Sequence, residues 1–255
     1  MHRFNGGVYL PLSITTNCEA PMGSGLGASS TIVVSMLKAY DELLNLALDD
    51  YELARLAVYI ERKVCGLQGG KQDQYAAAFG GFNFIEFGAG GEVLVNSLRI
   101  KNWVINELEA AILLCFTGVS RESGNIIKDQ SQNLSGNNEQ ALEAMHRLKN
   151  DALVMKKSLL EGDLGKLIDC VNQSWINKTQ TSSRVSNRDI DNIMTLAFRL
   201  GALAGKVSGA GGGGFIWFIV EPEKKVSISN ALEQLGCVVA NCRFTKKGAE
   251  SWTLK

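Results

Sequence analysis

Residues 21–31 combine alternating glycines with a run of hydroxyl side chains, directly in front of an amphipathic helical pattern. The glycines are Gly23, Gly25 and Gly27, and the hydroxyl residues are Ser29, Ser30 and Thr31. Glycines let the backbone turn tightly and come close to a ligand. The free amides in the first turn of a helix, at the positive end of its dipole, bind anions. The segment therefore predicts an anion site, with hydroxyls that could hold a metal ion or a phosphate oxygen.

Two known nucleotide-binding patterns are alternatives for this loop. No Gly-Lys-Ser/Thr sequence ends it, so it lacks the lysine with which a P-loop reaches the terminal phosphates. Gly23, Gly25 and Ala28 satisfy the dinucleotide pattern G-x-G-x-x-A, and an aspartate follows roughly twenty residues later, as a ribose-binding acid would. Against that pattern, six residues separate Gly23 from the preceding strand signal, and the helical pattern continues through residues 43–48 without a turn. The loop thus favours a phosphate site over a dinucleotide site.

Two carboxylates downstream could carry acid–base or metal chemistry. Asp73 lies in a glycine-containing loop at residues 69–74, where an acid could meet a substrate hydroxyl as a general base. Its structural alternative is the N-cap of the helix that follows. Glu61 lies twelve residues upstream, beside Arg62 and near the end of a predicted helix. Taken alone, Glu61 would be a solvated glutamate.

A second glycine-rich loop, at residues 206–215, lies between two strong strand signals. A tight turn does not need so many glycines, whereas a loop whose backbone packs against a ligand or against another glycine loop does. The alternative is an unusually flexible hairpin. The sequence therefore predicts that the backbone of this loop packs against a ligand or against the first glycine loop.

Composition narrows the functional classes. The chain has 255 residues, of which 45% are apolar and 20% charged, as in soluble globular proteins. Because 26 acidic residues balance 26 basic ones, the charge gives no support to a nucleic-acid-binding or an anionic-membrane-binding surface. No apolar run reaches the about 20 residues of a membrane helix. With only His2 and His146, neither a Ser-His-Asp hydrolase nor a histidine-based zinc site is expected.

The six cysteines lie far apart in apolar segments and form no CxxC pair. They are Cys18, Cys65, Cys115, Cys170, Cys237 and Cys242. In a chain of this size, such cysteines are typical of a reducing compartment. We therefore expect core-filling thiols and a cytoplasmic protein.

The elements that must position these groups follow from periodicity in the first half of the chain. Alternating apolar residues predict a half-buried strand over residues 8–16, and helical spacing predicts a helix up to residue 44. A second helix is predicted from Asp49, with Glu52 completing a capping box and Val64 on the buried face. Further on, the pattern predicts a short helix through residues 76–78, a hairpin of residues 82–87 and 93–95, and a strand over residues 111–116.

The second half begins with helices and ends in strands. The predicted helices include a long amphipathic one after the turn at residues 135–138, then residues 163–175 and 188–200, and a last one from Pro222 to Leu235. The predicted strands cover residues 204–207, 215–220 and 238–240. The alternation of strands and helices predicts an α+β protein, with a domain boundary near residues 116–120.

In this order, these elements resemble the GHMP kinase superfamily, and within it the D-glycero-α-D-manno-heptose 7-phosphate kinases. Residues 21–31 resemble the family's central phosphate-binding motif, residues 206–213 its C-terminal glycine motif, and residues 69–81 and 116–123 the heptose kinase segments. The resemblance implies a truncated ribosomal-S5-domain-2-like domain over residues 1–117 and a ferredoxin-like domain over residues 118–255. It also implies transfer of phosphate from ATP to the anomeric hydroxyl of a heptose 7-phosphate.

The resemblance also assigns roles to residues. Asp73 matches the catalytic acid that accepts the substrate proton, and Ser29 and Glu61 match the ligands of Mg²⁺, which prefers oxygen donors. The loop that would hold the ATP phosphates comprises Gly23, Ser24, Gly25, Leu26, Gly27, Ala28, Ser29 and Ser30. The substrate residues would be Gly70, Lys71, Arg121, Ser208, Gly209, Ala210 and Gly211. For Arg121 we expect a bidentate grip on the sugar phosphate, and a surface arginine is the alternative.

The chain departs from the family pattern at two places. Ala28 stands where many relatives have serine, which removes one phosphate hydrogen bond and spares the metal ligand. Relatives also begin earlier, by about 100 residues, the size of a small domain. That part carries an Arg-x-x-x-Gly-Gly-Gly-Thr-Asp-like motif, which is absent before Val8. We therefore expect an exposed sheet edge, and with it either self-association of this chain or its origin in a longer protein that was clipped or misannotated.

The sequence-based expectation is a cytoplasmic sugar kinase that uses ATP and Mg²⁺ and acts on a heptose 7-phosphate. Another sugar kinase of the same superfamily, similar to galactokinases or fucokinases, is the alternative enzyme. A non-catalytic remnant that binds nucleotide without turnover is the alternative from another functional class.

Overall fold

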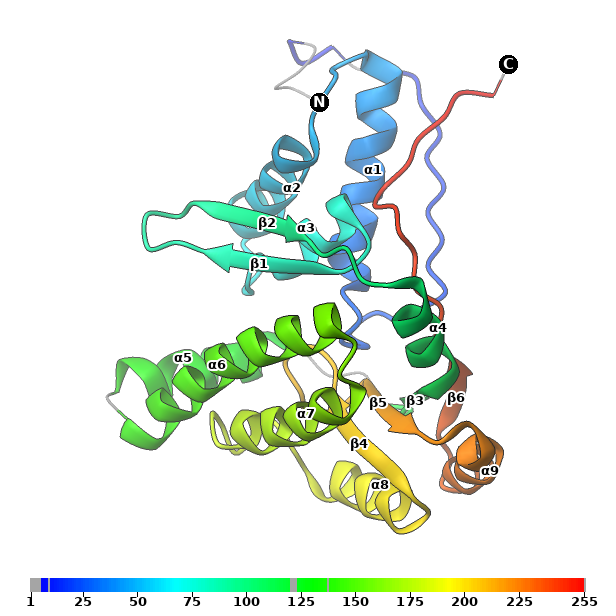
Figure 1. Cartoon of the computed structure of the whole chain (residues 1–255). Coiled ribbons are helices and arrows are strands. Elements are labelled where there is room, and N and C mark those ends of the chain that lie inside the picture. Colours follow the sequence, from blue (N-terminus) through cyan, green and yellow to red (C-terminus); the bar gives the residue numbers. More distant parts are fainter. Residues whose placement is uncertain (1–5, 9, 120–122, 137, 255) are drawn as a thin grey trace.

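The computed structural model describes residues 6–8, 10–119, 123–136 and 138–254, which form two layered parts (Figure 1). The helices in chain order are α1 (Ala28–Leu44), α2 (Asp50–Tyr59), the π-helical turn η1 (Ile60–Val64), α3 (Gln72–Phe79), α4 (Asn102–Ala111), α5 (Ser123–Ser135), α6 (Glu139–Glu161), α7 (Leu164–Thr179), α8 (Arg188–Arg199), the 3₁₀ turn η2 (Pro222–Lys224) and α9 (Lys225–Gln234). The strands are β1 (Asn83–Phe87), β2 (Val93–Ser97), β3 (Ile112–Phe116), β4 (Ala202–Val207), β5 (Phe215–Val220) and β6 (Val238–Asn241).

The first part packs α1, α2 and α3 against the antiparallel β1–β2 hairpin. Its core contains Val34 of α1, Leu53 of α2 and Tyr75 of α3. The predicted capping box is confirmed: Asp49 accepts from the Glu52 amide at 2.7 Å, and Glu52 accepts from the Asp49 amide at 3.1 Å. Helix α2 therefore starts at a defined residue, which fixes the position of the chain that continues to Glu61.

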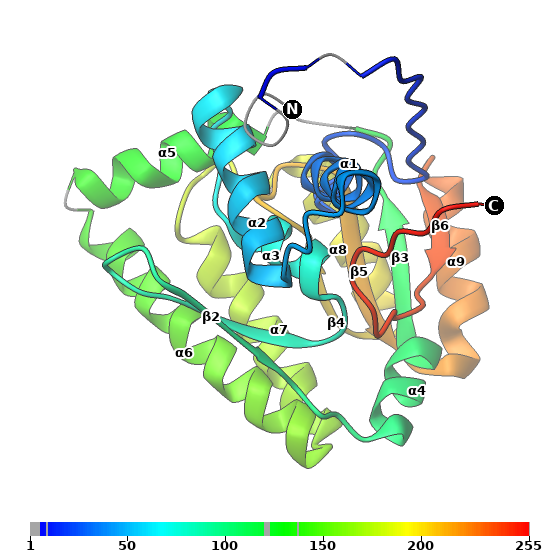
Figure 2. The same ribbon diagram turned by 90° about the horizontal axis from the view of Figure 1, so that it is seen from above.

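The second part is an antiparallel sheet in the order β4-β5-β3-β6, with helices on both faces. Because side chains alternate along a strand, Leu113 and Cys115 face α8 and α9, whereas Ile112 faces α4 and α7. The glycine-rich loop between β4 and β5 leaves this sheet at the end nearest α1 (Figures 1 and 2).

The mixed helix and strand content confirms the α+β prediction. Strand β3 lies before the predicted boundary but pairs with β5 and β6. The whole strand therefore belongs to the sheet of the second half. Ala249 also returns to the first part and donates to the Ala77 carbonyl at 3.0 Å. A division at residues 117 and 118 stays a prediction, and any such division has to accommodate these contacts.

The half-buried strand predicted over residues 8–16 is wrong. Its described residues run alongside α1 in an extended course without ladder hydrogen bonds (Figure 1). Leu12 is 42% exposed and Ile14 is 52% exposed. The alternation of side chains suits a strand, but a strand also needs a neighbour, and no described strand lies against this segment.

Two further expectations need correction. Cys115, Cys170 and Cys237 are buried, as predicted for core-filling thiols, but Cys18 and Cys65 are exposed. The sequence analysis also missed α4, whose N-terminus lacks a capping side chain. Among the described residues, no helix combines the length and apolarity that crossing a membrane requires.

Candidate functional site

The first glycine loop turns sharply into α1. Gly23, Gly25 and Gly27 have φ values of 74°, 80° and 73°, a region that favours glycine. Thr31 is the first residue of the helix to donate inside it, to the Gly27 carbonyl at 2.9 Å. Among the described residues, no side chain caps this end of α1. Within that part of the chain the preceding amides are thus left for another acceptor, the arrangement expected of an anion-binding helix terminus.

A π-helical turn explains the burial of Glu61. In η1 the Cys65 amide donates to the Ile60 carbonyl at 2.8 Å, a bond spanning five residues. The extra residue rotates the helix face, so Glu61 is 2% exposed while Val64, predicted to face inward, is 65% exposed. The solvated-glutamate alternative is therefore wrong. A 3.6-residue period cannot reveal such a turn.

Neutral donors surround the buried Glu61 carboxylate. Ser29 and Ser30 donate to Oε1 at 3.3 and 3.2 Å. Gln74 of α3 donates to Oε2 and, at 2.9 Å, to the Ser30 hydroxyl. No salt bridge to Glu61 occurs among the described residues. A buried carboxylate beside two hydroxyls and without a cationic partner fits a hard cation such as Mg²⁺.

Asp73 lies across from the glycine loop. A Cβ built on Gly27 would lie 3.2 Å from both Cβ and Cγ of Asp73, so the acid packs directly on the loop. The Asp73 side chain reaches solvent, but neighbouring protein atoms partly desolvate it and raise its pKa. The Glu61 charge raises the pKa further, and the Arg62 charge opposes both effects. Lys71, not Asp73, precedes the first residue of α3, so the N-cap alternative for Asp73 is wrong.

The two glycine loops pack backbone against backbone. A Cβ on Gly25 would lie 2.9 Å from the Ser208 carbonyl oxygen, and one on Gly209 would lie 2.9 Å from the Gly25 Cα. The Phe215 amide donates to the Ser24 carbonyl at 2.8 Å. This contact is the one predicted for a loop so rich in glycine, and it contradicts the flexible-hairpin alternative.

The outer side of the second loop is held by residues that the sequence analysis did not single out. The Gly212 amide donates to the Val185 carbonyl at 2.7 Å, and Asn187 donates to the Gly212 carbonyl at 3.1 Å. Lys178 donates from α7 to the Val207 and Gly209 carbonyls. The sequence predicts no role for Lys178 or Gln74, because a polar residue on a helix carries no local signal that shows what it contacts in the fold.

The other predicted site residues take different positions. Ser24 is fully buried, and its hydroxyl has no partner among the described residues, whereas Leu26 is 40% exposed. Ala28 is buried in the first turn of α1. Of the predicted substrate residues, Gly70 accepts from Arg62 at 2.8 Å. The remaining described ones are Lys71, which is exposed, and Ala210 and Gly211, which are half-buried in the second loop. Arg121 lies outside the described residues.

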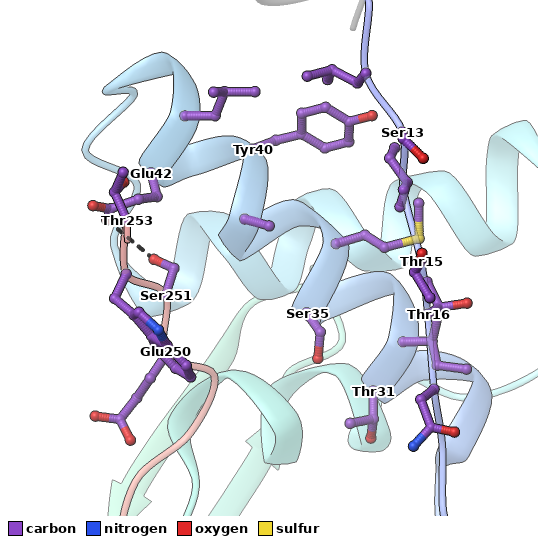
Figure 3. A pocket seen from close by; sticks show the side chains of 18 of the residues that line it. Ser13, Thr15, Thr16, Thr31, Ser35, Tyr40, Glu42, Glu250, Ser251 and Thr253 are labelled. Carbon is purple, nitrogen blue, oxygen red and sulfur yellow. Dashed lines mark hydrogen bonds between the residues drawn. The ribbon is translucent and has the colours of Figure 1, made fainter. Parts of the chain in front are cut away.

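A groove lies beside the first loop, along another face of α1. It encloses about 770 Å³. Its walls are the extended residues 12–18, the α1 face from Thr31 to Leu43, and residues 250–254 near the C-terminus (Figure 3). Ser251 donates to Glu42 across it at 3.2 Å. The groove lining includes Thr31, which directly follows Ser29 and Ser30 of the hydroxyl cluster in α1.

Comparison with known families matches two parts of the chain. Residues 1–81 match the GHMP kinases N terminal domain, and residues 155–237 match the GHMP kinases C terminal domain. The first match contains the first glycine loop, Glu61 and Asp73, and the second contains the whole of the second loop.

Individual relatives agree with these matches. The chain is 47% identical over 245 residues to a D-glycero-alpha-D-manno-heptose 7-phosphate kinase from Campylobacter jejuni, covering 96% of this chain and 72% of that protein. A crystal structure of a D-glycero-D-manno-heptose 1-phosphate kinase from Bacteroides thetaiotaomicron superimposes with a TM-score of 0.75 at 43% identity, covering 93% of this chain and 66% of that one. An L-fucokinase/L-fucose-1-P guanylyltransferase from Bacteroides fragilis is 26% identical over 226 residues, 88% of this chain and 24% of that protein.

Proposed function

Because this chain belongs to the GHMP kinase family, we propose that it transfers a phosphoryl group from ATP to the anomeric hydroxyl of D-glycero-D-manno-heptose 7-phosphate. One observation carries the proposal. The Asp73 carboxyl group packs on Gly27, at the end of a loop whose backbone amides are left for an anion. A proton acceptor and a phosphate cradle therefore lie side by side.

In this proposal, the backbone of residues 23–28 binds the β- and γ-phosphates of ATP. Phosphoryl transfer depends chiefly on positioning and on stabilising charge at the phosphate oxygens, which amides held by a rigid loop supply. The sugar hydroxyl oxygen forms a bond to the γ-phosphorus as the bond to the ADP oxygen breaks. Asp73 accepts the hydroxyl proton. Its raised pKa, whose main cause is desolvation, makes the carboxylate a better proton acceptor than a solvated aspartate.

Ser29 and Glu61 would hold Mg²⁺ in this site. When bound, the ion would neutralise charge on the phosphates, and it ordinarily keeps several waters and phosphate oxygens beside one or two protein ligands. Gln74 would orient the Glu61 carboxylate by donating to it. The neutral donors around Glu61 support this assignment, because they leave its negative charge uncompensated within the described structure.

The substrate side of the proposal involves the two flanking loops. Gly70 and Lys71 precede α3, and Lys71 is exposed beside the proposed base, where a cation suits a phosphorylated sugar. On the opposite side, Ser208 and Gly209 pack against Gly25 of the first loop, and Ala210 and Gly211 would complete the substrate surface. We retain Arg121 as a candidate for the sugar phosphate on the resemblance alone. Val119, two residues before it and the last described residue of that segment, accepts from the Gly214 amide at 2.9 Å.

A substrate panel tests this function. ATP-dependent turnover is compared for heptose 7-phosphate, the free heptose, galactose and fucose. We expect the highest kcat/KM with the 7-phosphate. A preference for a free sugar would favour the galactokinase- or fucokinase-like alternative, and nucleotide binding without turnover on any sugar would favour the non-catalytic one.

Replacing Glu61 by glutamine tests the proposed metal ligand. The substitution keeps the side-chain shape and removes the charge, so we expect the Mg²⁺ concentration for half-maximal turnover to rise about 10- to 100-fold. Glu139→Gln, at an exposed position on α6, is the matched control. The measurement is turnover across a Mg²⁺ titration at saturating ATP. An unchanged Mg²⁺ dependence would remove Glu61 from the ligand set.

We also propose a cytoplasmic location and self-association. The six cysteines are all free thiols, which suits a reducing compartment.

Residues 12–18 are extended and carry no charge, and the exposed Leu12 and Ile14 offer an edge on which a second copy could pair. Light scattering at micromolar concentration is expected to give a dimer or larger species. A monodisperse monomer would contradict the self-association.

A further inference from the structure

Lys178 points at backbone rather than at an acidic side chain. It lies in the last turn of α7, where a lysine usually extends its ammonium group into water. Here the ammonium nitrogen donates to the Val207 carbonyl at 3.2 Å and to the Gly209 carbonyl. These carbonyls mark the end of β4 and the start of the second glycine loop. Lys178 therefore joins α7 to the place where that loop leaves the sheet.

Gly209, one of the two residues whose carbonyls Lys178 binds, also contacts the first loop. A Cβ on Gly209 would lie 2.9 Å from both the Cα and the carbonyl oxygen of Gly25. Any shift of Gly209 toward or away from α7 would therefore move the backbone surface on which Gly25 rests. One residue separates the Lys178 ammonium from the proposed phosphate cradle.

The charges around Lys178 make it a costly residue to keep there. Its charged neighbour is Lys206 of β4, which donates to Ser174 at 2.5 Å and is itself attracted to Asp151 of α6. The described residues place no carboxylate in a salt bridge with Lys178. Desolvation, reinforced by Lys206, lowers the pKa of Lys178 to about 7.

An apolar side chain of similar length would avoid this cost. Lys178 is half-buried, and replacing a poorly compensated charge in such a place by a hydrophobic residue is often neutral or stabilising. The carbonyls of Val207 and Gly209 would then lose one donor. The stability of the fold therefore does not explain a lysine at position 178. Positioning of the second glycine loop by its ammonium group would explain it.

We propose that Lys178 is a positioning residue for phosphoryl transfer, which fixes the second glycine loop and through Gly209 the first loop. This inference rests on the kinase function proposed above. Lys178 touches neither ATP nor the sugar in this account. It acts by keeping the Gly25 backbone where the transferring phosphate requires its amides, and a displacement of about 1 Å in such a group can cost about 100-fold in rate.

The test compares Lys178→Met with Lys178→Arg. We expect Lys178→Met to lower kcat about 10- to 100-fold without lowering the thermal midpoint. The rate depends on the position of the loops, whereas the stability also gains from removal of a desolvated charge. Lys178→Arg keeps a charged donor and is expected to recover part of the rate. Lys166→Met, at an exposed position in the first turn of α7, is the matched control and is expected to match wild type.

Amide hydrogen exchange provides a readout that does not need catalysis. The Phe215 amide bonds to Ser24 across the two loops, so its exchange should accelerate in Lys178→Met and not in Lys166→Met. Unchanged exchange, or unchanged kcat in a folded Lys178→Met protein, would overturn the inference. A wild-type chain without turnover would instead contradict the proposed function, and the exchange comparison would then decide the role of Lys178 by itself.

Discussion

Replacing Asp73 by asparagine is expected to lower kcat about 100- to 10,000-fold, the usual contribution of a positioned general base. Asparagine has nearly the same shape but cannot accept the hydroxyl proton. The substitution also removes the repulsion between Asp73 and Glu61, so the thermal midpoint should stay the same or rise. The dissociation constant for ATP should change little, because Asp73 is assigned to the sugar hydroxyl and not to the phosphates.

Asp169→Asn, at an exposed position on α7, serves as the control for removing one negative charge. It should leave kcat at the wild-type value. Steady-state turnover and calorimetric ATP binding are measured on the same preparations. If Asp73→Asn retained wild-type turnover, another group would have to accept the proton and the assignment of Asp73 would be wrong.

Replacing Gly25 by alanine is expected to weaken ATP binding and lower kcat/KM by about 100-fold. Two effects combine at this position. The φ of 80° disfavours a side chain, at a cost of about 1–2 kcal/mol for an alanine. The new Cβ would also lie 2.9 Å from the Ser208 carbonyl oxygen, so the two loops would have to separate. The amides proposed to hold the phosphates would move with the first loop.

Gly91→Ala separates these two effects. Gly91 lies in the β1–β2 turn with a φ of 92°, but a Cβ there has no atom within 4 Å. The control should therefore lose stability from backbone strain and keep wild-type ATP affinity. Equal ATP affinities of Gly25→Ala and wild type would show that loop contact does not shape the phosphate site.

Much of the fold could be predicted because local rules decide it. The capping box at Asp49 and Glu52 fixes the start of α2, and the glycines around the first loop mark the start of α1. The second glycine loop was expected to pack against another backbone, and it does so at Gly25. In each case the sequence segment itself contains the physical reason for its conformation.

Other features depend on contacts between distant residues and left no local pattern. The π-helical turn that buries Glu61 and exposes Val64 looks like ordinary helix in the sequence. Gln74 and Lys178 gain their importance only from what the fold brings near them. Residues 10–16 show the reverse case. Their clear alternating pattern does not form a strand, because no described strand pairs with them.

The proposed reaction is phosphorylation of the anomeric hydroxyl of a heptose 7-phosphate, with Asp73 accepting the proton. Phosphorus NMR can follow it in the wild-type chain incubated with Mg²⁺, ATP and D-glycero-D-manno-heptose 7-phosphate, beside the same mixture containing Asp73→Asn. We expect a new anomeric phosphate signal with wild type, growing in step with ADP, and almost none with Asp73→Asn. ADP formation without that signal, or an equal signal from both proteins, would rule out the proposed reaction or the role of Asp73 in it.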